Sequence, residues 1–423
     1  MKNKSSIIHI IGAGISGLIA AQVLENYGYK PTIIEGSNSV GGRVKSDLVE
    51  GYTLDRGFQV LLTSYPAAKK YINFETLKLQ KLLPGAVIFK KGKSQTIGDP
   101  LRSFSLLFPT LFSSIGTFSD KIKILKLNIL LNKKRIDTIF KEDEKTTLQY
   151  LIDFGFSEAI IQLFFKPFFS GIFLEPNLDT SSRMFEFIYK MFGEGLAVLP
   201  KDGIQAISNQ LKDNLKNTKI LLNSKVESVK NKLIILKDGT EIESDFTIIA
   251  TEASPLVTNL KNQENIWKTC DTLYFETSKR IISRPLIGLI SEENSLINNL
   301  FYHTSVKTTT KGDHELLSVT VVKKHQLNEK DLIKKIREEL LQCCNISDAK
   351  FLKRYQIKKA LPKLSNLQYE ISSTETKLTS SLFLAGDQLL NGSLNAAIIS
   401  GERAAMGVIG ILQDGLIVDE LSS

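Results

Sequence analysis

Apolar and polar positions along the chain form short apolar runs separated by amphipathic stretches, which predicts strands and helices in turn. Residues 6–35 hold an apolar run, a glycine-rich turn, a helical stretch and a second apolar run that ends in an acid. A further apolar run at 382–385 precedes a turn and a helix that begins near Ser393 and runs through Ala404. Both ends of the chain therefore predict an α/β fold with a doubly wound sheet.

The middle of the chain changes character several times. Residues 96–195 are rich in Phe and Leu and predict helices, whereas residues 256–350 predict alternating strands and one amphipathic helix at 329–341. Between them the pattern returns to α/β, with a helix at 204–215, strands at 220–222, 226–229, 233–236 and 246–250, and a hairpin turn at 237–240. We therefore expect two domains whose pieces are interleaved along the chain.

The first glycine-rich turn has the spacing of a dinucleotide site. Gly12 permits a tight turn after the first strand, Gly14 permits close approach of a pyrophosphate, and Gly17 lets the helix pack closely on the sheet. The helix that opens near Ile15 directs free N–H groups at the phosphates, and Glu35 lies 18 residues after Gly17, where it can accept ribose hydroxyls. The residues assigned to this site are Gly12, Ala13, Gly14, Ile15, Ser16, Gly17, Glu35 and Gly36. The alternative is an ordinary glycine-rich turn followed by a chance acid.

The residues after Glu35 indicate which dinucleotide is bound. A glycine loop with an arginine, Gly41-Gly42-Arg43, suits a diphosphate, since arginine can bind it in a bidentate manner. The stretch from Ile8 to Arg43 closely resembles the start of the flavin-containing amine oxidase superfamily, which includes amine oxidases, protoporphyrinogen oxidases, and phytoene desaturases and isomerases. The resemblance implies that Gly41, Gly42 and Arg43 contact the diphosphate of FAD and that Gly57, Phe58 and Gln59 lie beside the flavin.

The end of the chain resembles the closing FAD motif of the same family. By this resemblance Gly386 and Asp387 contact the ribityl or diphosphate portion, and the helix start at Leu394 and Asn395 points at the flavin ring. A positive helix N-terminus there would favour an anionic reduced flavin. The alternative is a strand–turn–helix in which Asp387 caps the helix.

Two internal strands also match the family. The resemblance implies that Val226 pairs its backbone with the adenine and that Ala250 lies beside the diphosphate, although ordinary strands would give the same patterns. In the family order, the FAD-binding domain comprises residues 1–95, 196–255 and 351–423, and an inserted α+β substrate domain comprises the helical segment 96–195 and the strand-rich segment 256–350.

Composition excludes several other classes of protein. The 423 residues are 42% hydrophobic and 23% charged, which is typical of a globular protein. The net charge of +9 comes from lysines spread along the chain and not from one basic stripe, so we expect no binding to nucleic acid. The three cysteines offer no disulfide framework, the four histidines have no metal-ligand spacing, and we expect no metal and a reducing cytoplasm. The run Ile7–Ile11 is too short for a signal peptide, and without an apolar stretch of eighteen residues we expect no membrane-spanning helix.

The inserted segment 96–195 holds the most apolar clusters. Residues 163–173, which resemble a segment of the protoporphyrinogen oxidase and desaturase branch, predict either a tunnel for a large apolar substrate or the core of a helical bundle. Residues 101–131 alternate Leu, Phe and Ile with Ser and Lys, which fits a basic amphipathic helix on a membrane surface or a helix packed on the domain.

Catalytic residues are not identified by the sequence. Amine oxidases of this family usually carry a lysine near flavin N5; here Cys270 falls near that place, and Lys268 is too uncertain in register to assign. No aromatic pair lies between Asp387 and Ser393, a departure from amine oxidases that favours an apolar substrate. No cysteine directly precedes the closing motif, so we expect non-covalent FAD. Residues 358–362 resemble a wall near the flavin, or simply a strand that ends at Pro362.

We therefore expect an FAD-dependent oxidoreductase that removes a hydride from a lipophilic substrate, isoprenoid- or porphyrinogen-like, and is reoxidised by oxygen or a quinone. The alternatives are an oxidase of primary amines or polyamines, and a non-catalytic FAD-binding protein. A nicotinamide-only dehydrogenase is disfavoured by the Gly41-Gly42-Arg43 loop and by Gly386-Asp387.

Overall fold

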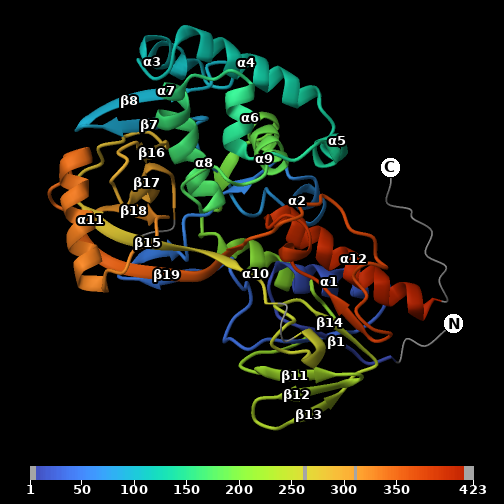
Figure 1. The fold of residues 1–423 in the computed structure, drawn as a ribbon. Coiled ribbons are helices and arrows are strands. Elements are labelled where there is room, and N and C mark those ends of the chain that lie inside the picture. Colours follow the sequence, from blue (N-terminus) through green and yellow to red (C-terminus); the bar gives the residue numbers. More distant parts are fainter. Residues whose placement is uncertain (1–5, 261–263, 309–311, 414–423) are drawn as a thin grey trace.

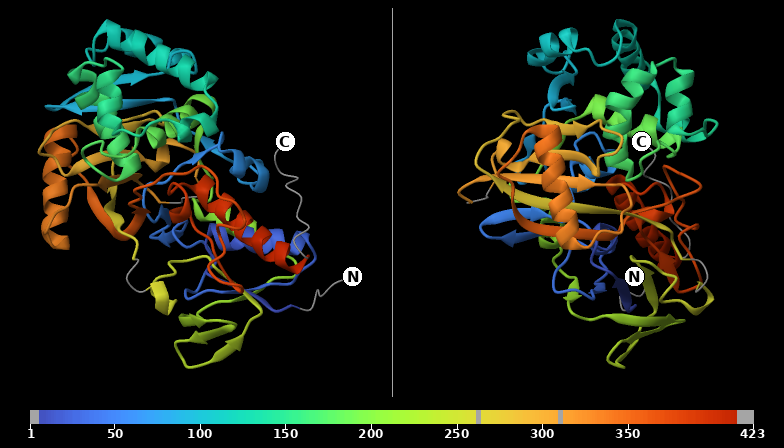
Figure 2. Two further views of the ribbon diagram at one scale, coloured as in Figure 1. Left: turned by 45° about the vertical axis from the view of Figure 1, so that its right-hand side comes forward. Right: turned by 60° about the vertical axis from the view of Figure 1, so that its left-hand side comes forward.

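The computed structural model describes residues 6–260, 264–308 and 312–413. A small parallel sheet with its helices forms one end of the molecule, a large, mostly antiparallel sheet lies beside it, and a group of helices covers the far end of the large sheet (Figure 1). Figure 2 shows the same three parts from two further sides.

The parallel sheet has five strands in the order β10-β2-β1-β14-β20, all running in the same direction. Their bounds are β1 Ile8–Ile11, β2 Thr32–Ile34, β10 Lys219–Leu221, β14 Phe246–Ile249 and β20 Leu382–Leu384. All four β1 side chains are buried, as expected for a parallel strand covered on both faces. The loops that follow β1, β2, β14 and β20 meet at one edge of this sheet, where open α/β sheets bind ligands.

Helices α1 (Ile15–Asn26) and α12 (Leu394–Leu412) pack on this sheet and on each other. A Cβ on Gly401 would lie 2.2 Å from the carbonyl oxygen of Ser16, so the two helices approach as closely as glycine allows. In the described part of the chain, α12 alone is long and apolar enough to span a membrane, which the sequence analysis did not anticipate; 72% of that window is buried inside the protein. This burial assigns α12 to the core of the parallel-sheet domain.

The large sheet has seven strands in the order β19-β15-β18-β17-β16-β7-β8. Their bounds are β7 Gly85–Lys90, β8 Lys93–Gly98, β15 Trp267–Thr277, β16 Ile287–Ile290, β17 Ile297–Tyr302, β18 Glu315–Val321 and β19 Lys350–Pro362. All neighbours pair antiparallel except β16 and β7. The amphipathic helix α11 (Glu329–Cys344) buries Leu332, Ile336 and Leu340 against one face, which leaves the other face for the rest of the molecule.

The helical region spans residues 104–194. Its elements are η1 Phe104–Leu106, α3 Leu107–Phe112, α4 Phe118–Lys133, α5 Ile136–Lys141, α6 Thr147–Asp153, α7 Glu158–Ile160, the π-helical turn η2 Ile161–Phe165, α8 Lys166–Phe173 and α9 Ser182–Glu194. Thr117 and Asp120 form a capping box at the start of α4, and Leu174 at φ +50° ends α8. Residues 101–131 are thus two helices with a break at 113–117, not one amphipathic helix.

The remaining elements connect these parts. They are the hairpin β3 Ser46–Val49 and β4 Tyr52–Asp55, the sheet β11 Val226–Lys230, β12 Leu233–Leu236 and β13 Glu241–Glu243, the sheet β5 Leu61–Leu62, β9 Ala197–Leu199 and β6 Gln80–Lys81, the helices α2 Pro66–Tyr71 and α10 Gln205–Asn214, and the turns η3 Thr258–Leu260, η4 His303–Ser305 and η5 Asp387–Leu389. The predicted strands at 220–222, 226–229, 233–236 and 246–250 correspond to β10, β11, β12 and β14 within one residue at each end.

Two of the predicted segment boundaries differ from the sheet pairing. The hairpin of β7 and β8 belongs to the large sheet, although the sequence places residues up to 95 in the first FAD-binding segment. Strand β19 also belongs to that sheet, although residues from 351 onward are assigned to the last FAD-binding segment. Both β8 and β19 are edge strands with many polar residues, so their local pattern does not reveal which sheet they join.

Candidate functional site

A cavity of about 2120 Å³ opens where the loops of the parallel sheet face the large sheet and the helical region. Most residues predicted from the sequence line it: Gly12, Gly14, Ile15, Ser16, Glu35, Gly41, Gly42, Arg43, Gly57, Phe58, Gln59, Ala250, Gly386, Asp387 and Leu394. Segments from both ends of the chain and from its middle therefore build one site.

Five predicted residues do not line the cavity. A Cβ on Gly17 would lie 2.0 Å from the carbonyl oxygen of Gly12, so Gly17 serves the packing of α1 under the loop. Ala13 and Gly36 flank the glycine loop and Glu35 without facing the cavity. Val226 is buried at the start of β11 opposite Leu236.

The helix start at Leu394 and Asn395 was predicted to point at the flavin, which stays a prediction; the Asn395 side chain itself is fully buried and its Oδ1 accepts the Ala67 N–H at 2.9 Å. The side chain therefore ties α12 to α2. Its neighbour Leu394 does line the cavity, because successive residues at a helix start point in different directions.

The carboxylate of Glu35 organises the glycine loop. It accepts the backbone N–H of Ala13 at 2.7 Å and of Ser37 at 2.8 Å, and also the Ser37 hydroxyl at 2.7 Å. Helix α1 begins beside it at Gly14 with no side-chain cap and no acid in its first turn. The first N–H groups of α1 thus face the cavity without a competing carboxylate, which suits a phosphate.

The Gly41-Gly42-Arg43 loop lies directly against the first glycine loop. Gly41 donates its N–H to the Ala13 carbonyl at 2.8 Å, and both Gly41 (φ +120°) and Gly42 (φ +60°) have left-handed backbones. This conformation brings the two loops together and leaves the backbone of the loop exposed to the cavity. The structure therefore supplies the close backbone approach that a diphosphate needs.

Arg43 connects the loop to the far end of the chain. Its guanidinium forms an ion pair with the largely buried Asp387 and donates to the Ala360 carbonyl at 3.1 Å. It also lies over the Trp267 ring, 5.3 Å from the centroid. Residues 358–362 line the cavity and form the end of β19, so the predicted strand that ends at Pro362 is confirmed and a place beside the flavin stays a prediction. The contact of Trp267 with Arg43 was not predicted, although Trp267 is the one tryptophan of the chain.

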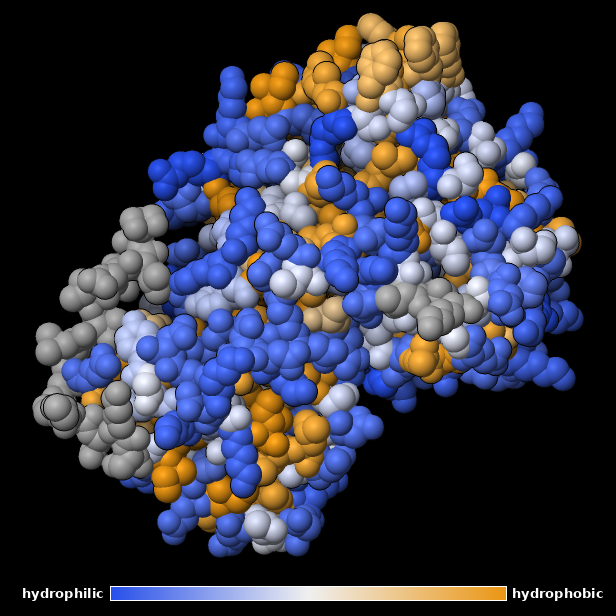
Figure 3. Space-filling view, turned by 180° about the vertical axis from the view of Figure 1, so that it is seen from behind, coloured by the Kyte–Doolittle hydropathy of each residue, from blue (hydrophilic) through white to orange (hydrophobic). Residues whose placement is uncertain are grey.

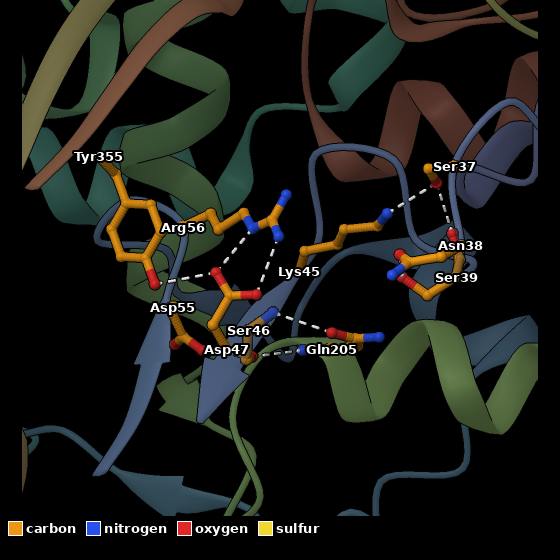
Figure 4. A network of polar contacts seen from close by, with 10 residues as sticks. All are labelled: Ser37, Asn38, Ser39, Lys45, Ser46, Asp47, Asp55, Arg56, Gln205 and Tyr355. Atoms are coloured by element: carbon orange, nitrogen blue, oxygen red, sulfur yellow. Dashed lines mark hydrogen bonds and ion pairs between the residues drawn. The ribbon is translucent and has the colours of Figure 1, made fainter. Parts of the chain in front are cut away.

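Polar side chains beneath the loop form a network (Figure 4). Lys45 donates to the Ser37 hydroxyl at 2.9 Å, and Arg56 forms two hydrogen bonds to Asp47, at 2.9 and 2.8 Å. The Tyr355 hydroxyl donates to the same Asp47 at 2.9 Å. The Arg56 guanidinium lowers the pKa of Asp47, mainly by its hydrogen bonds, so that Asp47 stays ionised at the cavity wall.

Asp55, which precedes the predicted Gly57-Phe58-Gln59 contacts, is also buried in this network. Its Oδ1 accepts the Ser46 hydroxyl at 2.6 Å and the Ile204 N–H at 2.9 Å. Burial raises the pKa of Asp55 to about 6, because the charged form is poorly solvated there. Asp55 therefore holds the hairpin of β3 and β4 against the start of α10, and it positions Arg56 and Gly57, which line the cavity.

The part of the cavity beyond the loops is aromatic. Phe164, Phe168, Phe169, Phe173, Tyr189 and Phe192 line it, whereas Phe165 of the same cluster is fully buried in the helical core. Some side chains of residues 163–173 therefore line the cavity and others form the helical core, while binding of a large apolar substrate there stays a prediction. This wall offers a large apolar surface, while charged side chains such as Glu175, Asp179 and Lys268 also line the cavity.

Lys268 and Cys270 both line the cavity from β15. Lys268 donates to the Phe173 carbonyl at 2.9 Å and to the Thr180 hydroxyl at 3.0 Å, and burial lowers its pKa. Burial raises the pKa of the Cys270 thiol to about 12, so Cys270 is protonated and a poor nucleophile at neutral pH. Lys268 is thus the basic group that β15 supplies to this cavity.

Comparison with known proteins agrees with this arrangement. A family model described as flavin-containing amine oxidoreductase matches residues 15–409. Protoporphyrinogen oxidase 2, chloroplastic/mitochondrial, from Arabidopsis thaliana is 24% identical over 164 residues, which are 39% of this chain and 32% of that protein. L-amino-acid oxidase from Protobothrops flavoviridis is 27% identical over 259 residues, 57% of this chain and 51% of that protein.

These matches thus span between about a third and half of the length of the two relatives. Among solved structures, the putative protoporphyrinogen oxidase from Exiguobacterium sp. 255-15 superposes with a TM-score of 0.68 at 17% identity, covering 96% of this chain and 98% of that one. The predicted fold class, a Rossmann-like domain with an inserted substrate domain, is thereby confirmed.

Proposed function

Because the chain belongs to the flavin-containing amine oxidoreductase family, we propose that it is an oxidoreductase that binds FAD without a covalent link and oxidises an apolar small molecule. The observation that carries this proposal is the cavity itself, which joins a diphosphate-type cradle to an aromatic wall. When bound, FAD supplies two-electron oxidation of a substrate C–H bond.

The residues that would hold FAD fit its parts in turn. Glu35 would accept ribose hydroxyls, and the first N–H groups of α1 together with Gly42 and Arg43 would bind the diphosphate. The N-terminus of α12, capped by Ser393 and free of acids in its first turn, would stabilise negative charge on the ring system. The cysteines at 270, 343 and 344 lie outside the closing segment around Gly386 and Asp387, which supports a dissociable rather than a thioether-linked flavin.

The aromatic wall favours a lipophilic substrate of isoprenoid or porphyrinogen type, with oxygen or a quinone as the acceptor. Phe164, Phe168 and Phe192 can cover such a molecule and exclude water from its reacting carbon. Oxidation of an amine is the second candidate: Glu175 and Asp179 also line the cavity, and L-amino-acid oxidase is among the relatives. We propose a cytoplasmic enzyme, since Cys270, Cys343 and Cys344 are buried free thiols.

The first test is the absorbance spectrum of the purified protein, repeated on the supernatant after heat denaturation. Flavin bands that move to the supernatant are expected; a colourless protein that takes up no added FAD would overturn the cofactor assignment. The second test is anaerobic mixing of the holoprotein with a polyene isoprenoid, a porphyrinogen or putrescine, followed by bleaching of the flavin bands.

Bleaching by an apolar compound that is lost in Phe168→Asp and kept in Ile152→Asp would support the lipophilic substrate. Phe168 lines the cavity, whereas Ile152 is an exposed side chain of α6, so the pair controls for the added charge. Bleaching by putrescine alone would favour the amine oxidase. A non-catalytic role for FAD would be indicated if none of these compounds reduces the flavin and if, after photoreduction, no acceptor reoxidises it.

A further inference from the structure

The helical region exposes ten large apolar side chains between residues 101 and 130. They are Leu101, Phe104, Phe108, Leu111 and Phe112 around α3, and Phe118, Ile122, Leu125, Ile129 and Leu130 on α4, and we call them the apolar surface. Their exposed fractions run from 40% for Leu130 to 79% for Phe112. Figure 3 shows apolar side chains gathered at the end of the molecule where Figure 1 places α3 and α4. A contiguous group of this kind marks an interaction site.

Helix α4 shows that this exposure is not a by-product of core packing. Its inward stripe, Ile124, Leu127 and Leu131, already satisfies the core: Leu127 and Leu131 are fully buried, and Ile124 lines the cavity. Phe118, Ile122, Leu125 and Ile129 form a second stripe with spacings of three and four residues, which faces solvent. A surface helix of a globular protein normally carries polar residues there.

The charged side chains that residues 101–133 present to solvent are of one sign. Residues 101–133 include Lys121, Lys123, Lys126 and Lys133, and the one acid of this segment, Asp120, is fully buried in hydrogen bonds to Thr117 and Ser157. No carboxylate of this segment is therefore presented to solvent. This charge is complementary to anionic lipid headgroups. Two copies of the same surface facing each other would instead bring lysines against lysines.

The same segment forms part of the cavity wall. Asp99 and Arg102, just before η1, line the cavity together with Ile124 and Asn128 of α4. One side of α4 thus borders the cavity while the opposite side carries the exposed stripe. If lipid covered the apolar surface, only helix α4 and its neighbours would separate a molecule dissolved in that lipid from the aromatic wall of the cavity.

We propose that α3 and α4 dock on an anionic phospholipid bilayer, with the apolar surface buried in the headgroup–acyl boundary and the exposed Lys126 and Lys133 at the phosphates, since Lys121 and Lys123 donate to backbone carbonyls. The cavity then takes its apolar compound from the membrane. The docking goes beyond the proposed function and does not depend on it, because lipid binding needs no flavin chemistry.

The test is flotation of the FAD-loaded protein with vesicles of phosphatidylglycerol and phosphatidylcholine in equal parts, and with phosphatidylcholine alone. We expect the protein to float with the anionic vesicles and to be released by high salt. The variant Phe108→Gln/Phe112→Gln/Phe118→Gln should bind at least about tenfold more weakly, because three large apolar side chains no longer enter the lipid. The control Leu48→Gln/Leu341→Gln changes exposed side chains on β3 and α11 and should bind as the native chain does.

The flavin spectrum of each variant reports that it is folded. A native chain that stays unbound, or a triple variant that binds equally well, would overturn the proposal. A native dimer that the triple variant makes monomeric, without vesicle binding in either, would assign the surface to a second copy instead. Vesicle binding without oxidation of any apolar compound would contradict the proposed function alone.

Discussion

Arg43 and Asp387 form an ion pair although 344 residues separate them in the sequence. Asp387 is almost completely buried, whereas the Arg43 side chain is 40% exposed and also contacts Ala360 and Trp267. The pair therefore joins the loop after β2 to the turn after β20 at the wall of the cavity. The ion pair positions the Arg43 guanidinium and adds little to the stability of the fold, since a partly exposed ion pair is screened by water.

The coupling of this pair can be measured through FAD affinity. Arg43→Gln should raise the Kd about tenfold or more, because it removes a diphosphate contact and leaves the Asp387 carboxylate uncompensated. Adding Asp387→Asn should recover part of that loss, giving a coupling energy of about 1 kcal/mol or more. Isothermal titration of the apoprotein with FAD checks both values. The exposed pair Arg135 and Asp137 is the control: its variants should leave FAD affinity unchanged.

Two glycines of the first loop should separate binding from folding. Gly14→Ala meets only the Gly42 Cα, at 4.0 Å, so we expect a stability loss of about 1 kcal/mol or less and a large loss of FAD affinity. Gly17→Ala would place Cβ 2.0 Å from the Gly12 carbonyl oxygen and should cost about 1–3 kcal/mol of stability before any ligand is added. Urea unfolding of the apoproteins gives the comparison. Equal destabilisation by both substitutions would contradict the assigned roles.

Glu35→Gln should weaken FAD binding by about 10- to 100-fold, since a carboxylate is a stronger acceptor for ribose hydroxyls than an amide. Glu25→Gln is a matched control because Glu25 also accepts two backbone N–H groups and one hydroxyl, from Lys216, Asn217 and Thr218. Its site lies away from the cavity, so its variant should bind FAD normally. Similar affinities for the two variants would remove Glu35 from the cofactor site.

Because of Asp55, the free energy of unfolding should decrease as the pH rises from about 4 to about 6. Its pKa is about 6 in the folded chain, against an ordinary value of 3.8, so the folded state holds the proton over this range and the unfolded state releases it. The stabilisation by Asp55 is fully present below the pKa of the unfolded chain and disappears as the pH rises to the pKa of the folded chain. At 1.36 kcal/mol per pH unit, it amounts to roughly 3 kcal/mol.

The substitution Asp55→Asn isolates this contribution, because an amide Oδ1 can still accept from Ser46 and Ile204. The difference in unfolding free energy between variant and native chain should grow in favour of the variant between pH 4 and 6 and then stay constant. Urea unfolding at pH 4, 5, 6 and 7 gives that difference. A difference that does not change with pH would show that Asp55 is ionised in the folded state.

The cofactor loops were predictable because their chemistry is local. The spacing of Gly12, Gly14 and Gly17 and the distance to Glu35 are set by one strand–turn–helix–strand unit, and the structure builds that unit as expected. The contacts of Arg43 with Ala360 and Trp267 were not predictable, because they depend on where β15 and β19 cross the cofactor domain. The polar pattern of an edge strand such as β8 does not show which sheet the strand joins, so the pairing of residues 85–98 with the large sheet could not be predicted.

The strand order of the parallel sheet has a consequence for synthesis. Strand β14 ends at Ile249, but its neighbour β20 begins only at Leu382, and α12, which packs on α1, follows it. A ribosome adding about 5–20 residues per second needs on the order of ten seconds to make the intervening chain. During that interval one edge of β14 and one side of α1 lack their partners, and Asp387 has not yet been made. FAD should therefore load only after residue 412 has left the ribosome, and nascent chains should depend on chaperones until then.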